Sequence, residues 1–495
     1  MKRQNEVTAM PAVNGQQYIE RIDQLKANIW YEGKKITGKI SEHPAFKGVI
    51  KSQAKLYDLQ HHPDLIDLMT WKSDTTGNRI GTSYLPPRNH EDLEKRRLAI
   101  QEWAKLSCGM LGRSPDYMNT ALMTFGTSAK ILEDQSMECA QNMKKYYEYV
   151  RENDLALTHT FIQPQVNRAS FYIEESPEII AAQIVDENDD GIVIHGARLL
   201  ATQGGTTDEI IVFPSGAQLP QISGTAPYAY AFAIPNNTPG LKFMTRESFD
   251  YGKSTFDHPL GSRFEEMDTI VVFDRVTVPW DRVFIHGSVP VNNRLYNDSG
   301  FFSHTTHQII CKNVIKTEFL LGLMQKMIDE INVGEYQHIH EKISEVIVGI
   351  EAMKGFIYSS EKQAKMNQWG VFSPDPNPLL AATQYYPKIY PRFVEIIQLI
   401  GASGLVSIPT EADFKSELKP ELDLYLQSSQ SKGEDKVRLF RLAWDACMSA
   451  FGSRQVLYER FFFGDPVRLA TNLYNKYNRK HFVERVNDFL QKDPD

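Results

Sequence analysis

The chain has 495 residues, of which 42% are hydrophobic and 23% charged, and its formal net charge is −8. This composition is that of a globular protein, and the length exceeds what one core organises, so two or three domains are expected. The negative charge disfavours nucleic acid and anionic membrane surfaces as partners.

Compartment can be predicted from the apolar runs and the cysteines. No run of about 20 apolar residues could span a bilayer, and no apolar signal segment follows the N-terminus. The four cysteines are widely spaced, which favours free thiols in a reducing compartment: Cys108, Cys139, Cys311 and Cys447. We therefore expect a cytoplasmic protein with no membrane contact.

The first 150 residues have the apolar spacing of helices. It recurs over residues 16–31, 46–60 and 91–110. Arg113-Ser-Pro115 interrupts the pattern, and Pro115 can begin another helix that continues to about residue 132. A further helix is expected over 135–150. We predict an N-terminal helical domain, residues 1–150, whose first 15 residues form a loose tail.

Beyond residue 150 the pattern changes to short strands. Apolar runs at 182–185 and 192–195 flank an Asp, Asn and Gly turn, which is a hairpin signature. Further runs lie at 209–213, 228–234 and 268–273, with Pro and Gly between them. We predict a middle β domain, residues 151–288.

The remainder of the chain is expected to be helical. Long amphipathic patterns cover residues 312–333, 338–368, 378–400 and 436–460. Such helices with short connections are typical of an antiparallel bundle. We predict a C-terminal helical bundle, residues 289–495.

The stretch LTHTFIQPQVNR, residues 157–168, lies where the helical and β regions meet. His159 is the side chain there best suited to exchange a proton near neutrality, and ligand sites favour domain junctions. The alternative is that Thr158 and Thr160 alternate on a strand and His159 is an ordinary buried histidine. These residues alone favour that alternative.

Arg113 and Tyr117 are four residues apart at the predicted start of a helix. If Pro115 is the first helical residue, a guanidinium and a phenol converge at a helix N-terminus, where negative charge is favoured. The alternative is an N-terminal ion pair with Asp116. Spacing alone favours the ion pair.

Five separated segments resemble, in sequence and in order, the oxygenase component of the 4-hydroxyphenylacetate 3-monooxygenase family. They are GRSPDYMN at 112–119, LTHTFIQPQVNR at 157–168, ATQGG at 201–205, DHPLGSRF at 257–264 and FGSRQVLYERFFFGDP at 451–466. The resemblance extends from about residue 18 to about residue 485. It implies an α+β, acyl-CoA dehydrogenase-like fold with a barrel-like middle domain, and a homotetramer assembled through the C-terminal bundle.

The resemblance also implies a two-component flavin-dependent monooxygenase. Such an enzyme uses reduced FAD and O₂ to hydroxylate 4-hydroxyphenylacetate, or a similar 4-substituted phenol, ortho to its hydroxyl. A separate NAD(P)H:flavin reductase supplies the FADH₂ by diffusion. The chain has no G-x-G-x-x-G and no P-loop motif, which agrees with flavin that arrives already reduced.

Site residues follow from the same resemblance. Arg113, Tyr117 and His159 are expected to contact the phenol oxygen, with His159 as the base. Ser215 is a candidate for contact with the para substituent. The expected flavin contacts are His159, Thr160, Phe161, Gln165, Val166, Asn167, Arg168, Thr202, Gly452, Ser453, Arg454 and Gln455.

Other functions are open. The first is a chlorophenol or nitrophenol monooxygenase of the same family. The second is a lyase like 4-hydroxybutyryl-CoA dehydratase, which holds an iron–sulfur cluster partly through a His and a Cys seven residues apart, as His304 and Cys311 are. Only Cys108 lies near Arg113, so four ligands cannot be completed and no metal is expected. A flavin-binding protein without catalysis is the third. Phe461, Phe462 and Phe463 are interpreted as bundle core or subunit interface.

Overall fold

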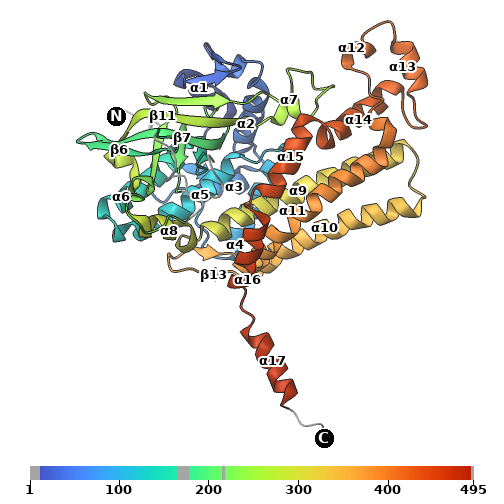
Figure 1. Ribbon diagram of the computed structural model, residues 1–495. Helices are drawn as coiled ribbons and strands as arrows, with labels where there is room; N and C mark the ends of the chain where they lie inside the picture. The colour runs from blue at the N-terminus through green and yellow to red at the C-terminus, as the bar shows by residue number, and fades with distance from the viewer. Residues whose placement is uncertain (1–11, 165–177, 215–217, 492–495) are drawn as a thin grey trace, which may run out of the picture.

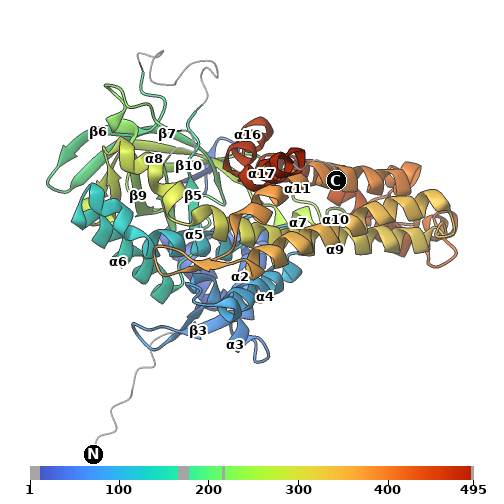
Figure 2. The same cartoon turned by 90° about the horizontal axis from the view of Figure 1, so that it is seen from below.

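The computed structural model describes residues 12–164, 178–214 and 218–491. Helices of the first third pack beside a β region, and a bundle of long helices extends away from both (Figures 1 and 2). This order of helices, sheets and helices is the α+β arrangement that the resemblance implied. The two changes of secondary structure fall near the predicted domain limits, and the division into three domains stays a prediction.

The N-terminal region is built from six helices: α1 (Gly15–Leu25), α2 (Lys47–Leu59), α3 (Ile66–Met69), α4 (His90–Leu106), α5 (Pro115–Thr127) and α6 (Met137–Asn153). The helix predicted over residues 16–31 is longer than the observed helix, α1. It ends at Lys26, which adopts a left-handed conformation, and the β-forming residues after it make strand β1 (Ile29–Tyr31). β1 pairs with a strand of the middle region, so the two regions share a sheet.

Two sheets form the β region. A six-stranded sheet has the order β2-β1-β10-β11-β7-β6, and a four-stranded sheet has the order β12-β9-β8-β5. Their strands are β2 (Lys34–Lys35), β5 (Leu157–Thr160), β6 (Gln183–Asn188), β7 (Gly191–Thr202), β8 (Glu209–Val212), β9 (Tyr230–Pro235), β10 (Leu241–Thr245), β11 (Asp268–Pro279) and β12 (Val283–His286). Two small hairpins lie outside, β3 (Thr70–Lys72) with β4 (Arg79–Gly81) and β13 (Lys365–Met366) with β14 (Phe372–Ser373). The predicted hairpin over 182–195 is confirmed as β6 and β7; closure into a barrel stays a prediction.

Strand β5 joins the two sheets through its threonines. Thr158 Oγ1 donates to the carbonyl of Thr202 and Thr160 Oγ1 to that of Leu199, each at 2.7 Å. Because side chains alternate along a strand, these bonds place His159 on the opposite face, toward the N-terminal helices. The two threonines therefore fix which way His159 points.

Three long antiparallel helices dominate the C-terminal region: α9 (Phe301–Glu330), α10 (Gln337–Lys362) and α11 (Pro376–Gly401). Shorter helices complete it: α8 (Val289–Asp298), α12 (Glu411–Phe414), α13 (Lys419–Tyr425), α14 (Gly433–Cys447), α15 (Ala450–Phe461), α16 (Pro466–Lys476) and α17 (Lys480–Leu490). The short helix α7 (Gly261–Phe264) precedes β11 in the middle region. The single helix expected over 436–460 is wrong, because Ser449 caps a new helix by accepting from the Gly452 N–H. Helix α9 also begins well before residue 312.

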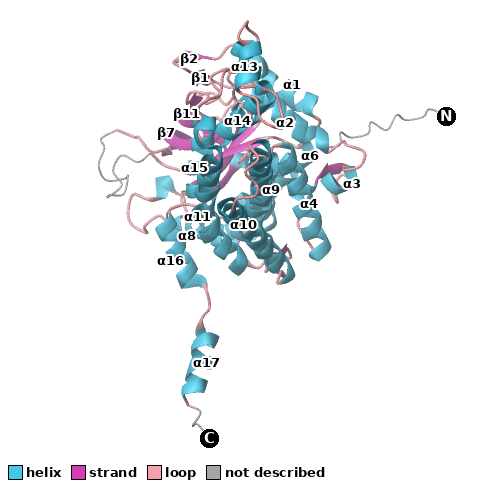
Figure 3. Cartoon of the chain, turned by 90° about the vertical axis from the view of Figure 1, so that its right-hand side faces the viewer, coloured by secondary structure: helices cyan, strands magenta, loops and turns pink. Residues whose placement is uncertain are grey.

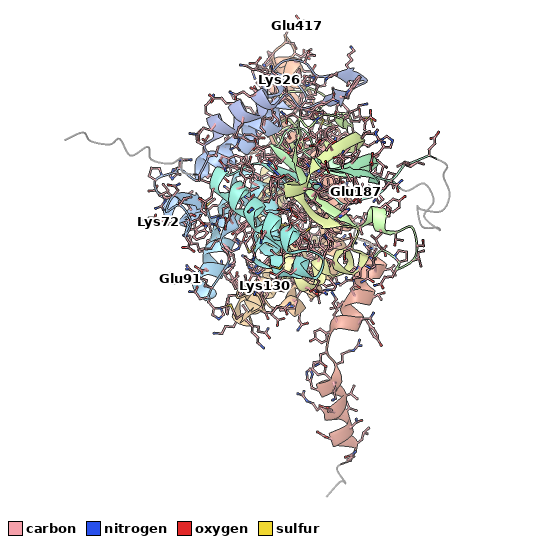
Figure 4. The ribbon with its side chains drawn as sticks, turned by 90° about the vertical axis from the view of Figure 1, so that its left-hand side faces the viewer. Lys26, Lys72, Glu91, Lys130, Glu187 and Glu417 are labelled. Atoms are coloured by element: carbon pink, nitrogen blue, oxygen red, sulfur yellow. The ribbon has the colours of Figure 1, made fainter. Side chains whose placement is uncertain are left out.

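The surface has two further features of note. Helix α17 extends away from the body of the protein (Figure 3), and all its residues are exposed. Charged side chains of both signs, such as Lys72, Glu91 and Lys130, project outward around the body (Figure 4). Among the described residues, no helix is long and apolar enough to cross a bilayer.

Candidate active site

The turn before helix α5 is held by a buried carboxylate. Glu266 accepts hydrogen bonds from the backbone N–H groups of Gly112, at 2.8 Å, and Arg113, at 2.6 Å. The Gln203 amide donates to the same carboxylate at 3.1 Å and to the Arg113 carbonyl at 3.2 Å. Pro115 is then the first residue of α5, as predicted. This turn carries the Arg113 side chain toward β5.

Arg113 and Tyr117 converge, which is the arrangement that the spacing alone did not favour. The guanidinium carbon of Arg113 lies 4.6 Å from the centre of the Tyr117 ring, a cation–π contact. The alternative ion pair with Asp116 is not formed, because Asp116 accepts from the Ser114 hydroxyl and the Gln308 amide instead. Arg113 Nε is buried without a hydrogen-bond partner among the described residues.

His159 faces the same space from strand β5. Its ring centre lies 5.6 Å from that of Tyr117, and the side chain is 3% exposed. The Nδ1 atom is buried and has no partner in the part of the chain that the structure describes. A buried polar atom without a partner is costly unless a ligand or water completes it. His159 is therefore not the satisfied core histidine of the alternative interpretation.

Aromatic rings enclose these three polar side chains. Phe161 stacks on His159 with ring centres 5.5 Å apart, and Phe213 lies 5.8 Å from His159. Phe462 lies 5.8 Å from the Tyr117 ring and 5.0 Å from the Arg113 guanidinium carbon. Such a lining, with few polar groups, suits a planar aromatic ligand with one polar end.

The protonation states follow from burial and from Arg113. Burial, with a contribution from Arg113, lowers the pKa of His159 well below its ordinary value, so the imidazole is neutral at pH 7. Burial raises the pKa of Tyr117 despite the nearby guanidinium, so the phenol stays protonated. Burial opposes the charge of Arg113, but Tyr458, Tyr117 and Glu266 outweigh it, and the pKa of Arg113 is raised. The site thus combines a proton acceptor, a hydroxyl donor and a fixed cation.

The expected flavin residues divide into three groups. Gln165, Val166, Asn167 and Arg168, with the substrate candidate Ser215, lie outside the described residues. His159 and Phe161 belong to the cluster of aromatic rings described above. The others, Thr160, Thr202 and Gly452 to Gln455, belong to β5, β7 and the first turns of α15.

Most of this last group is bonded within the chain. Arg454 makes two 2.7 Å hydrogen bonds to Asp268, and Thr202 donates to the same carboxylate at 2.8 Å. Gln455 donates to the Met110 carbonyl and accepts from a buried lysine. A Cβ at Gly452 would lie 2.7 Å from the backbone of helix α14, so close packing requires this glycine. These residues connect α15 to β11, to α14 and to the backbone at Met110.

Three residues of the site were missed from the sequence. They are Glu266, Tyr458, whose hydroxyl accepts from Arg113, and Phe462, which was interpreted as bundle core or subunit interface and lies against Arg113. A signal for two of them existed: positions 454, 458 and 462 are spaced by four, so they share one face of α15. Glu266 carried no such signal, because its role depends on backbone groups 153 residues away.

The alternative of a dehydratase-like lyase depends on possible cluster ligands in helix α9. His304 Nε2 is 2.9 Å from the Ser373 hydroxyl, and His307 Nε2 is 2.8 Å from Glu361. Cys311 is buried in the same helix. Within the described ranges, no three potential metal ligands cluster. These side chains take part in helix packing.

The fold and the site together define a class: α+β proteins in which a half-buried arginine meets a buried tyrosine and a buried histidine among aromatic rings. Two family models cover nearly the whole chain. "4-hydroxyphenylacetate 3-hydroxylase N terminal" matches residues 14–285, and "4-hydroxyphenylacetate 3-hydroxylase C terminal" matches residues 292–491. The chain belongs to the 4-hydroxyphenylacetate 3-hydroxylase family.

Individual relatives agree with that assignment. A probable 4-hydroxyphenylacetate 3-monooxygenase of Bacillus subtilis is 50% identical over 98% of this chain and 99% of its own. The oxygenase component of 4-hydroxyphenylacetate 3-monooxygenase, solved with FAD and 4-hydroxyphenylacetate, is 44% identical with a TM-score of 0.92, over 97% of this chain and 98% of that one. A 4-hydroxybutyryl-CoA dehydratase of N. maritimus has a TM-score of 0.86 at 19% identity, over 98% and 96% of the two chains, which shows the shared fold alone.

Proposed function

We propose that this chain is the oxygenase component of a two-component monooxygenase. It hydroxylates 4-hydroxyphenylacetate, or a similar 4-substituted phenol, ortho to the hydroxyl and gives a catechol. The observation that supports this most is the convergence of Arg113, Tyr117 and His159 among aromatic rings, with Arg113 Nε and His159 Nδ1 buried without partners in the described part of the chain. A solved relative of 44% identity holds FAD and that phenol together.

The three side chains have separate roles in this proposal. Neutral His159 accepts the phenol proton, which makes the ring carbon ortho to the oxygen more nucleophilic. Arg113 stabilises the phenolate charge that results, in a site from which water is largely excluded. Tyr117 stays protonated and donates to the same oxygen, which fixes the orientation of the ring.

The residues present also fit a flavin. His159 Nδ1 and Arg113 Nε offer unused polar atoms, and Phe161 offers a ring face parallel to His159. We propose that these residues, with Thr160, Thr202 and the first turns of α15, hold FAD. When bound, reduced FAD supplies the electrons and the reactivity toward O₂. The Arg113 cation favours the anionic, reduced form of the ring.

A reconstitution experiment tests the proposal. The purified chain is mixed with NADH, FAD, an unrelated flavin reductase and 4-hydroxyphenylacetate, and the catechol is measured by chromatography. We expect a catechol only when the reductase is present, because diffusing reduced flavin suffices. A parallel panel of 4-chlorophenol and 4-nitrophenol identifies the para substituent. Absence of catechol with every phenol would overturn the proposal.

We also propose that the chain forms a homotetramer. An isolated 11-residue helix such as α17 is marginal in water, yet its apolar side chains are between 43% and 76% exposed: Phe482, Val483, Val486, Phe489 and Leu490. The outer face of α10 also exposes Ile347 and Val348. A second copy of the chain can cover both surfaces. Light scattering of the full chain and of a chain ending at residue 477 tests this, and a full-length monomer would contradict it.

A further inference from the structure

Tyr458, on helix α15, is the side chain that accepts a hydrogen bond from the Arg113 guanidinium among the described residues. Its hydroxyl accepts a hydrogen bond from Arg113 Nη1 at 2.9 Å and donates one to the Gly112 carbonyl at 3.3 Å. We propose that Tyr458 is a positioning residue, which fixes the guanidinium so that its free Nε edge faces the phenolic substrate. This inference rests on the proposed function and assigns a further residue to the same site.

The Tyr458 ring is packed too closely to move. A Cβ at position 112 would lie 2.5 Å from the Tyr458 ring and hydroxyl, so the contact requires glycine there. On the other side, the Phe462 ring centre lies 5.1 Å from that of Tyr458. A hydroxyl held between two packed neighbours offers one fixed acceptor to Arg113. A pre-organised partner of this kind restricts the rotation of a long side chain.

Burial keeps the Tyr458 hydroxyl protonated despite the cations around it. Three cations lie near its ring centre: Arg113 at 5.9 Å, Arg454 at 5.7 Å and Lys312 at 5.4 Å. Burial nevertheless raises the pKa of Tyr458, so the hydroxyl stays protonated. A protonated hydroxyl can accept from Arg113 and donate to the Gly112 carbonyl at once.

The next residue anchors this part of α15. Glu459 is fully buried, and one of its oxygens accepts from Lys312 Nζ at 2.8 Å and from Lys316 Nζ at 2.7 Å. Lys316 also donates to Gln455, one turn earlier, at 2.6 Å. These bonds fix the rotation of α15 about its axis and so the position of Tyr458. Removal of a partner from such a buried ion pair is strongly destabilising, so this cluster is unsuitable for testing the role of Tyr458.

Loss of the Tyr458 hydroxyl would leave the pocket in place but free the guanidinium. Of the acceptors in the described part of the chain, its Nη1 would retain the Gly112 carbonyl, at 3.1 Å. More orientations of Arg113 would then be populated, and fewer would present Nε to the phenol oxygen. The cost should appear as weaker phenol binding and lower coupling, and it should depend on Arg113 being present.

The test is a double-mutant cycle on the full chain with Tyr458→Phe, Arg113→Ala and both together. Calorimetric titration with 4-hydroxyphenylacetate and no flavin gives the Kd, and reconstituted turnover gives catechol formed per O₂ consumed. We expect about tenfold weaker binding for Tyr458→Phe, as for a hydrogen bond to a charged group. The double variant should bind no more weakly than Arg113→Ala. Thermal melting confirms that each variant is folded.

Tyr390→Phe is the matched control. The Tyr390 hydroxyl is buried without a hydrogen-bond partner among the described residues. The Tyr390 ring centre lies 4.7 Å from Lys316 Nζ. We expect its Kd and coupling to equal those of the parent. Additive effects of Tyr458→Phe and Arg113→Ala, or no effect of Tyr458→Phe, would overturn the positioning role alone. A parent chain that neither binds nor hydroxylates any phenol would overturn the proposed function as well.

Discussion

Arg454 on helix α15 and Asp268 on strand β11 form a two-point ion pair, with Nε–Oδ2 and Nη2–Oδ1 both at 2.7 Å. Bidentate pairing fixes both position and orientation. The same aspartate accepts from Thr202, and Arg454 also lies 3.8 Å from Glu266, which holds the turn at Arg113. The pair therefore connects the bundle to the β region at the wall of the site.

The first prediction concerns the stability that this pair contributes. Arg454→Met should lower the free energy of unfolding by about 3 kcal/mol, because the buried carboxylate of Glu266 and the partly buried carboxylate of Asp268 lose a cation. Urea denaturation of the parent and the variant measures the difference. Arg460→Met, an exposed position on the same helix, is the control and should stay within about 0.5 kcal/mol. Equal losses in both variants would show that the Asp268 pair is not the cause.

The second prediction is the pH dependence of the same pair. Burial opposes the charge of Asp268, but Arg454, Arg246 and the Thr202 hydroxyl outweigh it and hold the pKa of Asp268 far below its ordinary value. A carboxyl with a depressed folded-state pKa stabilises the fold above its unfolded pKa of about 3.9, and the contribution is lost below it. The destabilisation caused by Asp268→Asn should therefore shrink as pH falls below about 4. Denaturation of both proteins from pH 7 to pH 3 tests this; a constant difference would contradict it.

The third prediction concerns His159 as the base. His159→Asn should reduce hydroxylation by about 10²–10⁴-fold, the usual loss of a general base. Oxygen consumption should continue, with H₂O₂ released in place of catechol. Because the pKa of His159 lies well below its ordinary value, parent activity should not fall as pH passes from 8 through 6.5. Catechol and H₂O₂ assays across this range check both points. Normal coupling in the variant would remove His159 from the mechanism.

The fourth prediction concerns Tyr117. Tyr117→Phe keeps the ring that packs on Arg113 and His159 but removes the hydroxyl donor. One hydrogen bond contributes about 0.5–1.5 kcal/mol, so phenol binding should weaken roughly two- to twelvefold. Calorimetric titration measures the change, and an unchanged melting temperature shows that the fold is intact. If binding and coupling are both unaffected, Tyr117 does not contact the substrate.

The fifth prediction concerns flavin as a substrate supplied from outside. The chain should purify almost colourless and show no NADH oxidation alone, since no dinucleotide fingerprint is present. Reduced FAD should bind more tightly than oxidised FAD, because the Arg113 cation favours the anionic ring. Anaerobic and aerobic titrations measure the Kd of reduced and of oxidised FAD. Arg113→Ala should reduce the difference between these two Kd values. Tightly bound oxidised FAD that NADH bleaches without a reductase would refute the two-component arrangement.

Local sequence determined much of the fold. Pro115 as the first residue of α5 and the hairpin of β6 and β7 both follow from patterns over fewer than fifteen residues. The ends of helices were harder to predict from the sequence. The break at Ser449 depends on one side-chain cap, and β1 becomes a strand because a distant strand, β10, is available to pair with it.

What only the tertiary structure decided is how the site is completed. The sequence alone favoured an ordinary core histidine at position 159. In the structure, the hydrogen bond from Thr158 on β5 to Thr202 on β7 places the His159 ring on the side of Tyr117. Tyr458 and Glu266 reach the turn at Arg113 from positions 345 and 153 residues away. A sequence records which groups can donate or accept, but the packing of helices and sheets decides which of them meet. For that reason the residues that hold Arg113 in place were found only in the structure.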